Sequence, residues 1–262
     1  MKKISVIVPI YNALEDVKEL LKSLLINFDF NQGTVILIND CSDIKTSEYL
    51  REFSEKNSDF KLINNEENLG FVKTCNKGIK LAETEIIVLL NSDTIIPNGF
   101  VQKIINCFEF DLKIGLASPI SSNSNAYYIY MREGYSVEKM NEELRKKHIC
   151  TYPMIPEAEG FCFCIRKKVI DEQGYLDEIY GKGYHEEVDF SYRAITNGWK
   201  IVLIDDLYVY HKRQASFGEQ ERERLLSKNN EVFYERWRGF RQKYKEDNNL
   251  INPVIAIEKE VF

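Results

Sequence analysis

The sequence predicts an α/β fold, in which a mostly parallel sheet is flanked by helices, and two observations support this prediction. Over residues 1–110, short apolar runs rich in branched side chains alternate with stretches whose apolar residues recur at helical spacing, which is the pattern of a doubly wound sheet. Most of these runs end in a cluster of polar residues. Because the carboxyl ends of parallel strands face one crevice, we expect a ligand to bind there.

The composition is that of a folded protein and narrows its class. The chain has 262 residues, of which 44% are hydrophobic, enough for a sizeable core. Its net charge of -6 argues against a nucleic-acid partner, which would call for a basic surface. The six cysteines are scattered, and we expect reduced thiols in a cytoplasmic protein. The sequence shows no signal peptide and no apolar run of membrane-spanning length.

The first half is expected to contain four strands, each followed by a helix. Pro9 closes the first strand, because proline cannot donate a hydrogen bond to a strand ladder. The fourth run, at residues 86–90, is apolar throughout, which indicates a strand buried on both faces. Gly78 weakens the third helix unless another element approaches it closely. The expected strands are residues 4–8, 35–38, 60–63 and 86–90, and the expected helices are residues 14–28, 43 to about 57, 68–81 and 98–110.

The second half breaks this alternation. A polar loop is expected over residues 119–125, and Gly198 is a helix stop signal. We expect one domain over residues 1–218 and a C-terminal helical extension over residues 219–262, packed on the same domain. The expected strands are residues 114–118, 160–165, 201–204 and 208–211, and the expected helices are residues 137–147, 168–173, 186–197 and 219–247.

The polar strand ends can together form a nucleotide pocket. An aromatic ring such as Tyr11 can stack on a base, and a carboxylate such as Asp40 can accept a hydrogen bond from a base N–H. Asp93, at the end of the fourth strand, can hold a divalent cation against a diphosphate. The sequence has neither the Gly-x-Gly-x-x-Gly fingerprint nor a Walker loop. Side chains and a metal ion, and not a glycine cradle, are therefore expected to hold the nucleotide.

At these positions the sequence resembles the family 2 glycosyltransferases, which have the GT-A fold. The resemblance extends over residues 4–218, and the order and spacing of its motifs are together specific. The matching segments are VIVPIYN at 6–12, NDCSD at 39–43, NLGF at 68–71, NKG at 76–78, LNSDT at 90–94, GKGYHEEVDF at 181–190 and VYHK at 209–212.

The resemblance implies an inverting enzyme that moves a sugar from a UDP- or dTDP-sugar to a hydroxyl of a saccharide or lipid-linked saccharide. Pro9 and Tyr11 would line the base pocket, and Asp40 would bond the uracil or thymine. The other residues implied in nucleotide-sugar binding are Asn12, Asn68, Gly70, Lys73, Asn76, Asn91, Ser92 and Asp93.

The resemblance also implies a metal site and a catalytic base. Asn91-Ser92-Asp93 matches the family's DXD-type motif, with Asp93 as a ligand of Mn²⁺ or Mg²⁺; Asn91 leaves this motif with one carboxylate. His211 matches a late histidine that can supply a further ligand. Glu186 and Glu187 match an acidic pair, usually Glu-Asp, whose second member deprotonates the acceptor hydroxyl. Which of the two glutamates acts is left open by the sequence.

Simpler structural roles are available for the same residues. Asp40 can cap a helix or form an Asx turn. Glu186 and Glu187 suit the first turn of a helix, where the macrodipole favours negative charge. A lone histidine such as His211 is more often a core residue than a ligand. Lys212 and Arg213 can bind diphosphate oxygens or remain solvated.

Two other functions are alternatives to a glycosyltransferase. A sugar-phosphate nucleotidyltransferase would need a glycine-rich, basic loop after the first strand, which residues 12–15 lack. A catalytically silent nucleotide-sugar-binding module would tolerate loss of the acidic pair, and Glu187 is retained. Basic and aromatic residues interleave in the C-terminal helix, which allows peripheral contact with the inner face of a membrane, although acidic residues among them argue against it. The basic residues are Arg236, Arg238, Arg241, Lys243 and Lys245.

Overall fold

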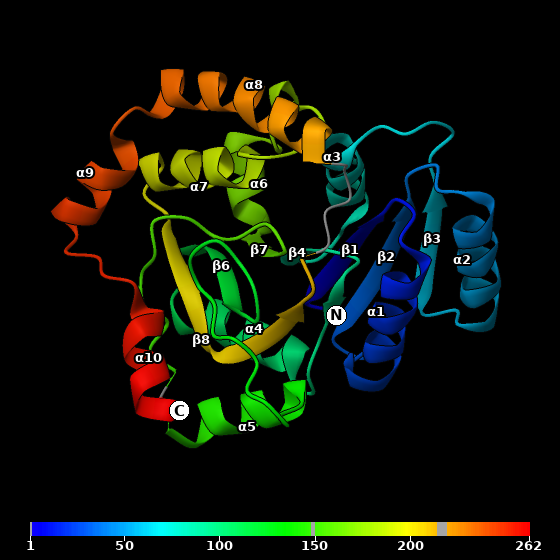
Figure 1. The fold of residues 1–262 in the computed structure, drawn as a ribbon, viewed down its shortest axis with the longest axis horizontal. Coiled ribbons are helices and arrows are strands. Elements are labelled where there is room, and N and C mark those ends of the chain that lie inside the picture. The colour runs from blue at the N-terminus through cyan, green and yellow to red at the C-terminus, as the bar shows by residue number, and fades with distance from the viewer. Residues whose placement is uncertain (1, 148–149, 214–218) are drawn as a thin grey trace.

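A computed structural model describes residues 2–147, 150–213 and 219–262 (Figure 1). In this part of the chain, eight strands are hydrogen-bonded in the order β3-β2-β1-β4-β7-β6-β8-β5. The strands are β1 (Ile4–Ile10), β2 (Gly33–Asn39), β3 (Phe60–Asn64), β4 (Ile86–Leu90), β5 (Thr94–Ile95), β6 (Ile114–Ser121), β7 (Cys162–Arg166) and β8 (Lys200–His211).

Ten α-helices accompany these strands within the described residues. They are α1 (Leu14–Asn27), α2 (Ile44–Lys56), α3 (Phe71–Leu81), α4 (Phe100–Phe110), α5 (Val137–Lys147), α6 (Lys167–Gln173), α7 (Glu186–Thr196), α8 (Glu219–Trp237), α9 (Phe240–Asp247) and α10 (Pro253–Val261). A single 3-10 turn (Glu178–Tyr180) precedes α7. None of the described helices is both long and apolar enough to cross a membrane.

The predicted α/β class with a mostly parallel sheet is confirmed. β1 runs parallel to β2 and β4, β2 runs parallel to β3, and β6 runs parallel to β8. β7 is antiparallel to both β4 and β6, and the short β5 is antiparallel to β8. The carboxyl ends of β1, β2 and β4 therefore face the same edge of the sheet, as the sequence predicts.

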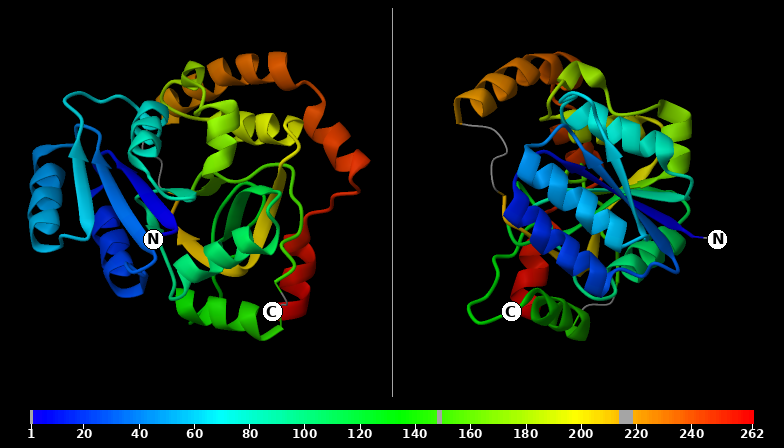
Figure 2. Two further views of the ribbon diagram at one scale, coloured as in Figure 1. Left: turned by 180° about the vertical axis from the view of Figure 1, so that it is seen from behind. Right: turned by 90° about the vertical axis from the view of Figure 1, so that its right-hand side faces the viewer.

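Helices cover both faces of the sheet because β1 and its neighbours bury both of their faces. Val6 and Val8 pack into one core with α1, α2 and α4, whereas Ile7 packs into a second core with α3, α6 and α7 (Figure 2). Gly78 has the close approach that would justify a glycine within α3. A Cβ atom there would lie 2.3 Å from Cγ2 of Ile7, so a larger residue would push the helix off the sheet.

Several predicted boundaries are wrong, each for an identifiable reason. Residues 200–211 form one strand and not two, because the carboxylate of Asp205 accepts hydrogen bonds from the backbone of Thr151 and Tyr152 and is thereby tolerated inside β8. The predicted helix over residues 219–247 is broken at Gly239, whose φ of 72° ends the α-helical path. β6 continues to Ser121 into the predicted loop, and α4 begins at Phe100, after Gly99, and not at residue 98.

The C-terminal helices pack on the rest of the chain. α8 lies across α7, and α10 lies beside α5 (Figure 1). The indole of Trp237 meets the ring of Tyr192 edge-on at 5.5 Å, and Ile257 of α10 is buried in the second core. The predicted division between residues 218 and 219 borders residues 214–218, which lie outside the described residues, so that boundary stays a prediction.

Candidate active site

A cleft with a volume of about 600 Å³ opens at the carboxyl ends of β1, β2 and β4. Its size suits a small organic ligand. It is lined by segments from both halves of the chain, including the loop before α7 and the end of β8. Most of the predicted site residues line it, namely Pro9, Tyr11, Asp40, Asn68, Gly70, Asn91, Ser92, Asp93, Glu186, Glu187 and His211.

Asp40 organises one wall of the cleft. Its Oδ1 accepts hydrogen bonds from the side chain of Asn65 at 2.7 Å and from the backbone N–H of Leu69 at 2.9 Å. Its Oδ2 accepts from the N–H of Gly70 at 2.9 Å. A carboxylate offers about four acceptor positions, so Asp40 holds the loop before α3 in place and retains acceptor capacity on Oδ2 toward the cleft.

Three predicted binding residues lie away from the cleft lining that the structure describes. Asn12 accepts from the N–H of Asp43 at 2.7 Å and so braces the turn after β2. Asn76 is buried and exchanges hydrogen bonds with the backbone of Leu176, at 2.9 and 3.1 Å. Lys73 is an exposed residue of α3. The first two side chains are thus engaged in supporting the fold, and direct contact with a nucleotide is not what their positions indicate.

Asp93 and His211 lie next to each other. Thr94 pairs with His211 across β5 and β8, and the N–H of Lys212 donates to the carbonyl of Asp93 at 3.0 Å. These backbone contacts place Nε2 of His211 3.4 Å from Oδ1 of Asp93. Lys212 itself is tied to Asp16 and Glu19 of α1 and does not line the described cleft, whereas Arg213 does.

The imidazole of His211 is held in one orientation. Its Nδ1 lies 2.9 Å from the carbonyl oxygen of Asn123, and its ring stacks on Phe161 at 5.0 Å between centroids. A carbonyl oxygen can only accept, so Nδ1 donates to it, and Nε2 is the ring nitrogen that faces Asp93. This arrangement of a backbone partner behind a ring nitrogen is typical of metal-binding histidines.

A divalent ion therefore fits between Asp93 and His211 chemically, since one carboxylate oxygen and one imidazole nitrogen point at the same place. Within the described chain, no group of three or more His, Cys, Asp and Glu side chains is arranged to hold a metal ion. Two protein ligands leave most positions of a six-coordinate ion to other donors, and diphosphate oxygens are suitable ones.

Glu186 and Glu187 open α7 and both reach the cleft. Glu186 is 5% exposed. The side chain of Glu187 lies against Gly160, where a Cβ atom would come 3.5 Å from Cγ of the glutamate. Among the described residues, no hydrogen-bond donor reaches Oε2 of either glutamate. Buried carboxylate oxygens without a partner are costly, and at the wall of a cleft they indicate a functional role.

The two carboxyl groups differ in their readiness to ionise. Burial raises the pKa of Glu187 from 4.5 to about 7. Burial, and then the neighbouring charge of Glu187, raises the pKa of Glu186 well above its usual range. Glu187 is therefore the member of the pair that ionises first as the pH rises through about 7, because two adjacent carboxyl groups resist ionising together.

Sequence reasoning missed several residues of the cleft. Glu159 accepts from the N–H groups of Ala126 and Asn125 at 2.8 and 3.3 Å and so fixes the loop after β6. Tyr184 and Leu226 line the cleft from the loop before α7 and from α8. Tyr184 lies within the matching segment over residues 181–190, whereas no motif marks Glu159 or Leu226. The acidic pair lies within a recognisable motif, but the residues that surround it in the cleft are brought there only by tertiary packing.

Solved structures with the same fold are glycosyltransferases. The crystal structure of GalNAc-T7 with UDP, GalNAc and Mn²⁺ matches with a TM-score of 0.66 at 16% identity, over 100% of this chain and 56% of that one. The mannosyltransferase PcManGT of Pyrobaculum calidifontis, in complex with GDP-Man and Mn²⁺, matches with a TM-score of 0.65 at 16% identity, over 98% of this chain and 68% of that one. Staphylococcus aureus TarS with UDP-GlcNAc matches with a TM-score of 0.60 at 18% identity, over 91% and 75% of the two chains. The fold is therefore the GT-A fold.

The sequence comparisons identify the family. The model of glycosyl transferase family 2 matches residues 5–174. The poly-beta-1,6-N-acetyl-D-glucosamine synthase of Staphylococcus epidermidis is 36% identical over 112 residues, which are 43% of this chain and 27% of the synthase. An uncharacterised glycosyltransferase of Methanocaldococcus jannaschii is 22% identical over 80% of this chain and 70% of its own length. The match to the synthase spans about a quarter of its length. The chain belongs to glycosyl transferase family 2.

Proposed function

We propose that the protein is an inverting, metal-dependent glycosyltransferase that transfers a sugar from a UDP- or dTDP-sugar to a hydroxyl of a saccharide or a lipid-linked saccharide. One observation carries the proposal: a single cleft is lined both by the Asp93–His211 pair and by the adjacent residues Glu186 and Glu187. The first suits a nucleoside diphosphate with its metal ion, and the second suits an acceptor hydroxyl. The names of the relatives and neighbours support this choice of substrates.

The donor half of the site binds the nucleotide and orients its diphosphate. The ring of Tyr11, which is 40% exposed at the cleft, stacks on the base, and Oδ2 of Asp40 accepts from a base N–H. Asp93 and His211 hold Mn²⁺ or Mg²⁺, which when bound offsets the charge that develops on the leaving diphosphate. Arg213 adds a positive charge at the same wall.

The acceptor half removes a proton. Glu187 is the better base of the pair, because its pKa of about 7 leaves it ionised at slightly alkaline pH while Glu186 still holds its proton. A carboxylate placed beside the attacking hydroxyl accepts its proton as the new glycosidic bond forms, which accelerates transfer roughly 10²–10⁴-fold. Attack opposite the leaving diphosphate inverts the anomeric carbon. Activity should therefore rise with pH through about 7.

The structure favours this enzyme over a silent binding module. Two adjacent carboxyl groups buried without partners for Oε2 destabilise the fold, and sugar binding alone would not require them. Peripheral contact with a membrane is less well supported by the structure than by the sequence, because two basic residues of the C-terminal helices are paired with carboxylates. Arg236 pairs with Asp177 and Asp189, and Arg241 pairs with Glu157.

The deciding experiment is a donor screen. Release of nucleoside diphosphate from UDP- and dTDP-sugars would be followed with saccharide acceptors, with Mn²⁺ and with a chelator. Metal-dependent release that requires an acceptor, with a product of inverted anomeric configuration by NMR, supports the proposal. Binding of the nucleotide without turnover of any donor would support the silent module, and release of pyrophosphate from a nucleoside triphosphate would support the nucleotidyltransferase.

A further inference from the structure

The loop that precedes the acidic pair has an unusual backbone. Gly181 and Gly183 have positive φ values of 62° and 130°, and they are followed by Tyr184 and His185 at 75° and 76°. Positive φ is readily adopted by glycine but is uncommon for two consecutive residues that carry a Cβ atom. Such a conformation persists only where surrounding contacts hold it. Since His185 directly precedes α7 as its N-cap residue, this loop sets where Glu186 and Glu187 lie.

α8 supplies these contacts through Asn229. The side chain of Asn229 is 1% exposed, and the two N–H groups of its amide are shared among three carbonyl oxygens, those of Tyr180 at 2.9 Å, Gly183 at 2.7 Å and Tyr184 at 3.1 Å. One side chain therefore joins the beginning and the end of the loop. The three carbonyls lie together because the loop turns back on itself, which its positive φ values allow.

His185 is held from the same helix. Its Nε2 lies 2.8 Å from Oδ1 of Asn230, and its ring stacks on Phe233 at 4.6 Å between centroids and 13° between planes. Asn230 and Phe233 are, like Asn229, residues of α8. The last residue before the acidic pair is thus fixed by a polar and an aromatic contact.

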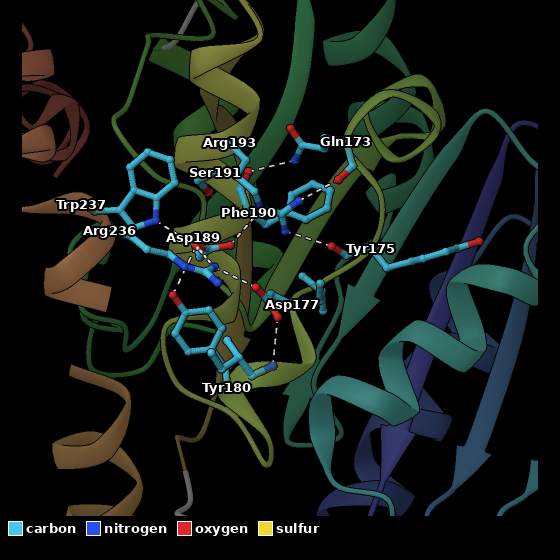
Figure 3. Close-up of polar contacts among 12 residues, drawn as sticks. Gln173, Tyr175, Asp177, Tyr180, Asp189, Phe190, Ser191, Arg193, Arg236 and Trp237 are labelled. Carbon is cyan, nitrogen blue, oxygen red and sulfur yellow. Dashed lines mark hydrogen bonds and ion pairs between the residues drawn. The ribbon is translucent and has the colours of Figure 1, made fainter. Parts of the chain in front are cut away.

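A third attachment secures the first turn of α7 from the other side of the acidic pair. The carboxylate of Asp189 is fully buried and accepts from Trp237 at 2.8 Å and from Arg236 at 3.2 Å, both from α8 (Figure 3). It also accepts from the hydroxyl of Tyr180 at 3.2 Å and from Arg193 at 2.8 Å. Glu186 and Glu187 therefore lie between two segments that α8 holds.

We propose that Asn229 is a positioning residue for the acceptor half of the site, which fixes the carboxylate of Glu187 through the loop over residues 181–185. This inference rests on the proposed function, because it takes Glu187 as the base. α8 also reaches the cleft directly through Leu226. The donor half is built from other elements, since Tyr11, Asp40 and Asp93 follow β1, β2 and β4. Asn229 acts on proton removal and leaves nucleotide binding to those elements.

The test compares Asn229→Leu, which keeps a similar volume but has no donor, with Lys228→Ala on the exposed side of α8. We expect Asn229→Leu to lower kcat for transfer roughly 10- to 100-fold, because small displacements of a catalytic group are costly. The donor Kd should stay within about twofold of wild type, and the pH midpoint of the acidic limb should shift. Lys228→Ala should behave as wild type. Asn229→Ser, which keeps one hydroxyl donor, should give an intermediate kcat and carries the test if the leucine variant does not fold.

Three outcomes would overturn the inference. An unchanged kcat in Asn229→Leu shows that the hydrogen bonds of Asn229 do not position the base. If kcat of Asn229→Leu falls only in proportion to the fraction of unfolded variant, and the pH profile does not move, then Asn229 has a role in stability alone. A parallel loss of donor affinity shows that Asn229 acts on the whole cleft. Glu187→Gln is measured in the same assay and separates the two proposals. Full transfer in Glu187→Gln rejects Glu187 as the base. An inactive Glu187→Gln together with a fully active Asn229→Leu rejects only the positioning role of Asn229.

Discussion

Nε2 of His211 lies 3.4 Å from Oδ1 of Asp93 because the next residue, Thr94, pairs with His211 across β5 and β8. The contact brings Asp93, which follows β4, against the carboxyl end of β8. Because Asn91 stands at the first position of the motif, Asp93 is its only carboxylate. The contact adds the imidazole of His211 as a second possible metal ligand of different chemistry. The proposed metal site is therefore a product of the strand pairing as much as of the motif.

The first prediction concerns this pair. Asp93→Ala should abolish metal-dependent binding of UDP or dTDP, and His211→Ala should weaken Mn²⁺ affinity about tenfold or more, because each removes one of two protein ligands. Isothermal titration with and without Mn²⁺ measures both. Phe161→Leu, which removes the ring stacked on His211 but no ligand, should have a much smaller effect. An unaltered Mn²⁺ titration in His211→Ala would make this histidine a core residue.

The second prediction distinguishes the two glutamates. Glu187→Gln should keep donor binding but lower transfer by roughly 10²-fold or more, since the amide cannot accept the proton. Glu186→Gln should keep most of the activity, because an amide resembles the protonated acid that the raised pKa of Glu186 implies. Initial rates at pH 8 measure both variants. The reverse result would assign the base to Glu186.

The third prediction concerns stability and pH. The native state raises the pKa of Glu187 from 4.5 to about 7, so between these values it holds a proton that the unfolded chain has lost. The contribution of Glu187 to the free energy of unfolding is therefore fully present below about pH 4.5 and is lost as the pH rises through about 7. Glu187→Gln removes that loss, and its Tm should exceed that of wild type at pH 8 and converge with it near pH 5. Thermal melts across this range test the sign, and a Tm difference that does not vary with pH would contradict it.

The fourth prediction concerns Asp40. Asp40→Asn places an NH₂ group against the N–H of Gly70 or against the donors of Asn65 and Leu69, so at least one hydrogen bond is lost. Urea unfolding should show a loss of about 1–3 kcal/mol, together with weaker nucleotide binding. Asp43→Asn is the matched control, because Asp43 caps α2 through Thr46 and asparagine caps equally well. Equal stability of the two variants would mean that Asp40 does not brace the loop.

The donor half of the cleft could be predicted because it depends on local signals. Tyr11, Asp40 and Asp93 each follow a strand of apolar residues, and parallel strands carry their carboxyl ends to one edge. The four strands of residues 1–110 follow from short apolar runs rich in branched residues, and the four helices follow from apolar residues that recur at helical spacing. Their boundaries differ from the expected ones by a few residues, as with the start of α4 after Gly99.

The rest of the cleft depends on contacts between distant residues. β5 has two residues, too few for any periodicity, yet it places His211. The acids Asp205 and Asp206 interrupt an apolar run, and the hydrogen bonds that Asp205 accepts from Thr151 and Tyr152 explain why the strand continues through it. Asn229 carries no motif at all, since its importance lies in three carbonyl groups more than forty residues earlier in the chain.

The hydrogen bond from Trp237 to Asp189 has a consequence for how the proposed active site forms during folding. The cleft lining extends in sequence from Pro9 to Leu226, so it is completed only after a loop of most of the chain closes, and such distant contacts form slowly. The chain has two tryptophans, and the indole of Trp237 is bonded to a buried carboxylate only when α8 has docked on α7. Its fluorescence is thus an intrinsic signal for the docking of α8 during assembly of the cleft.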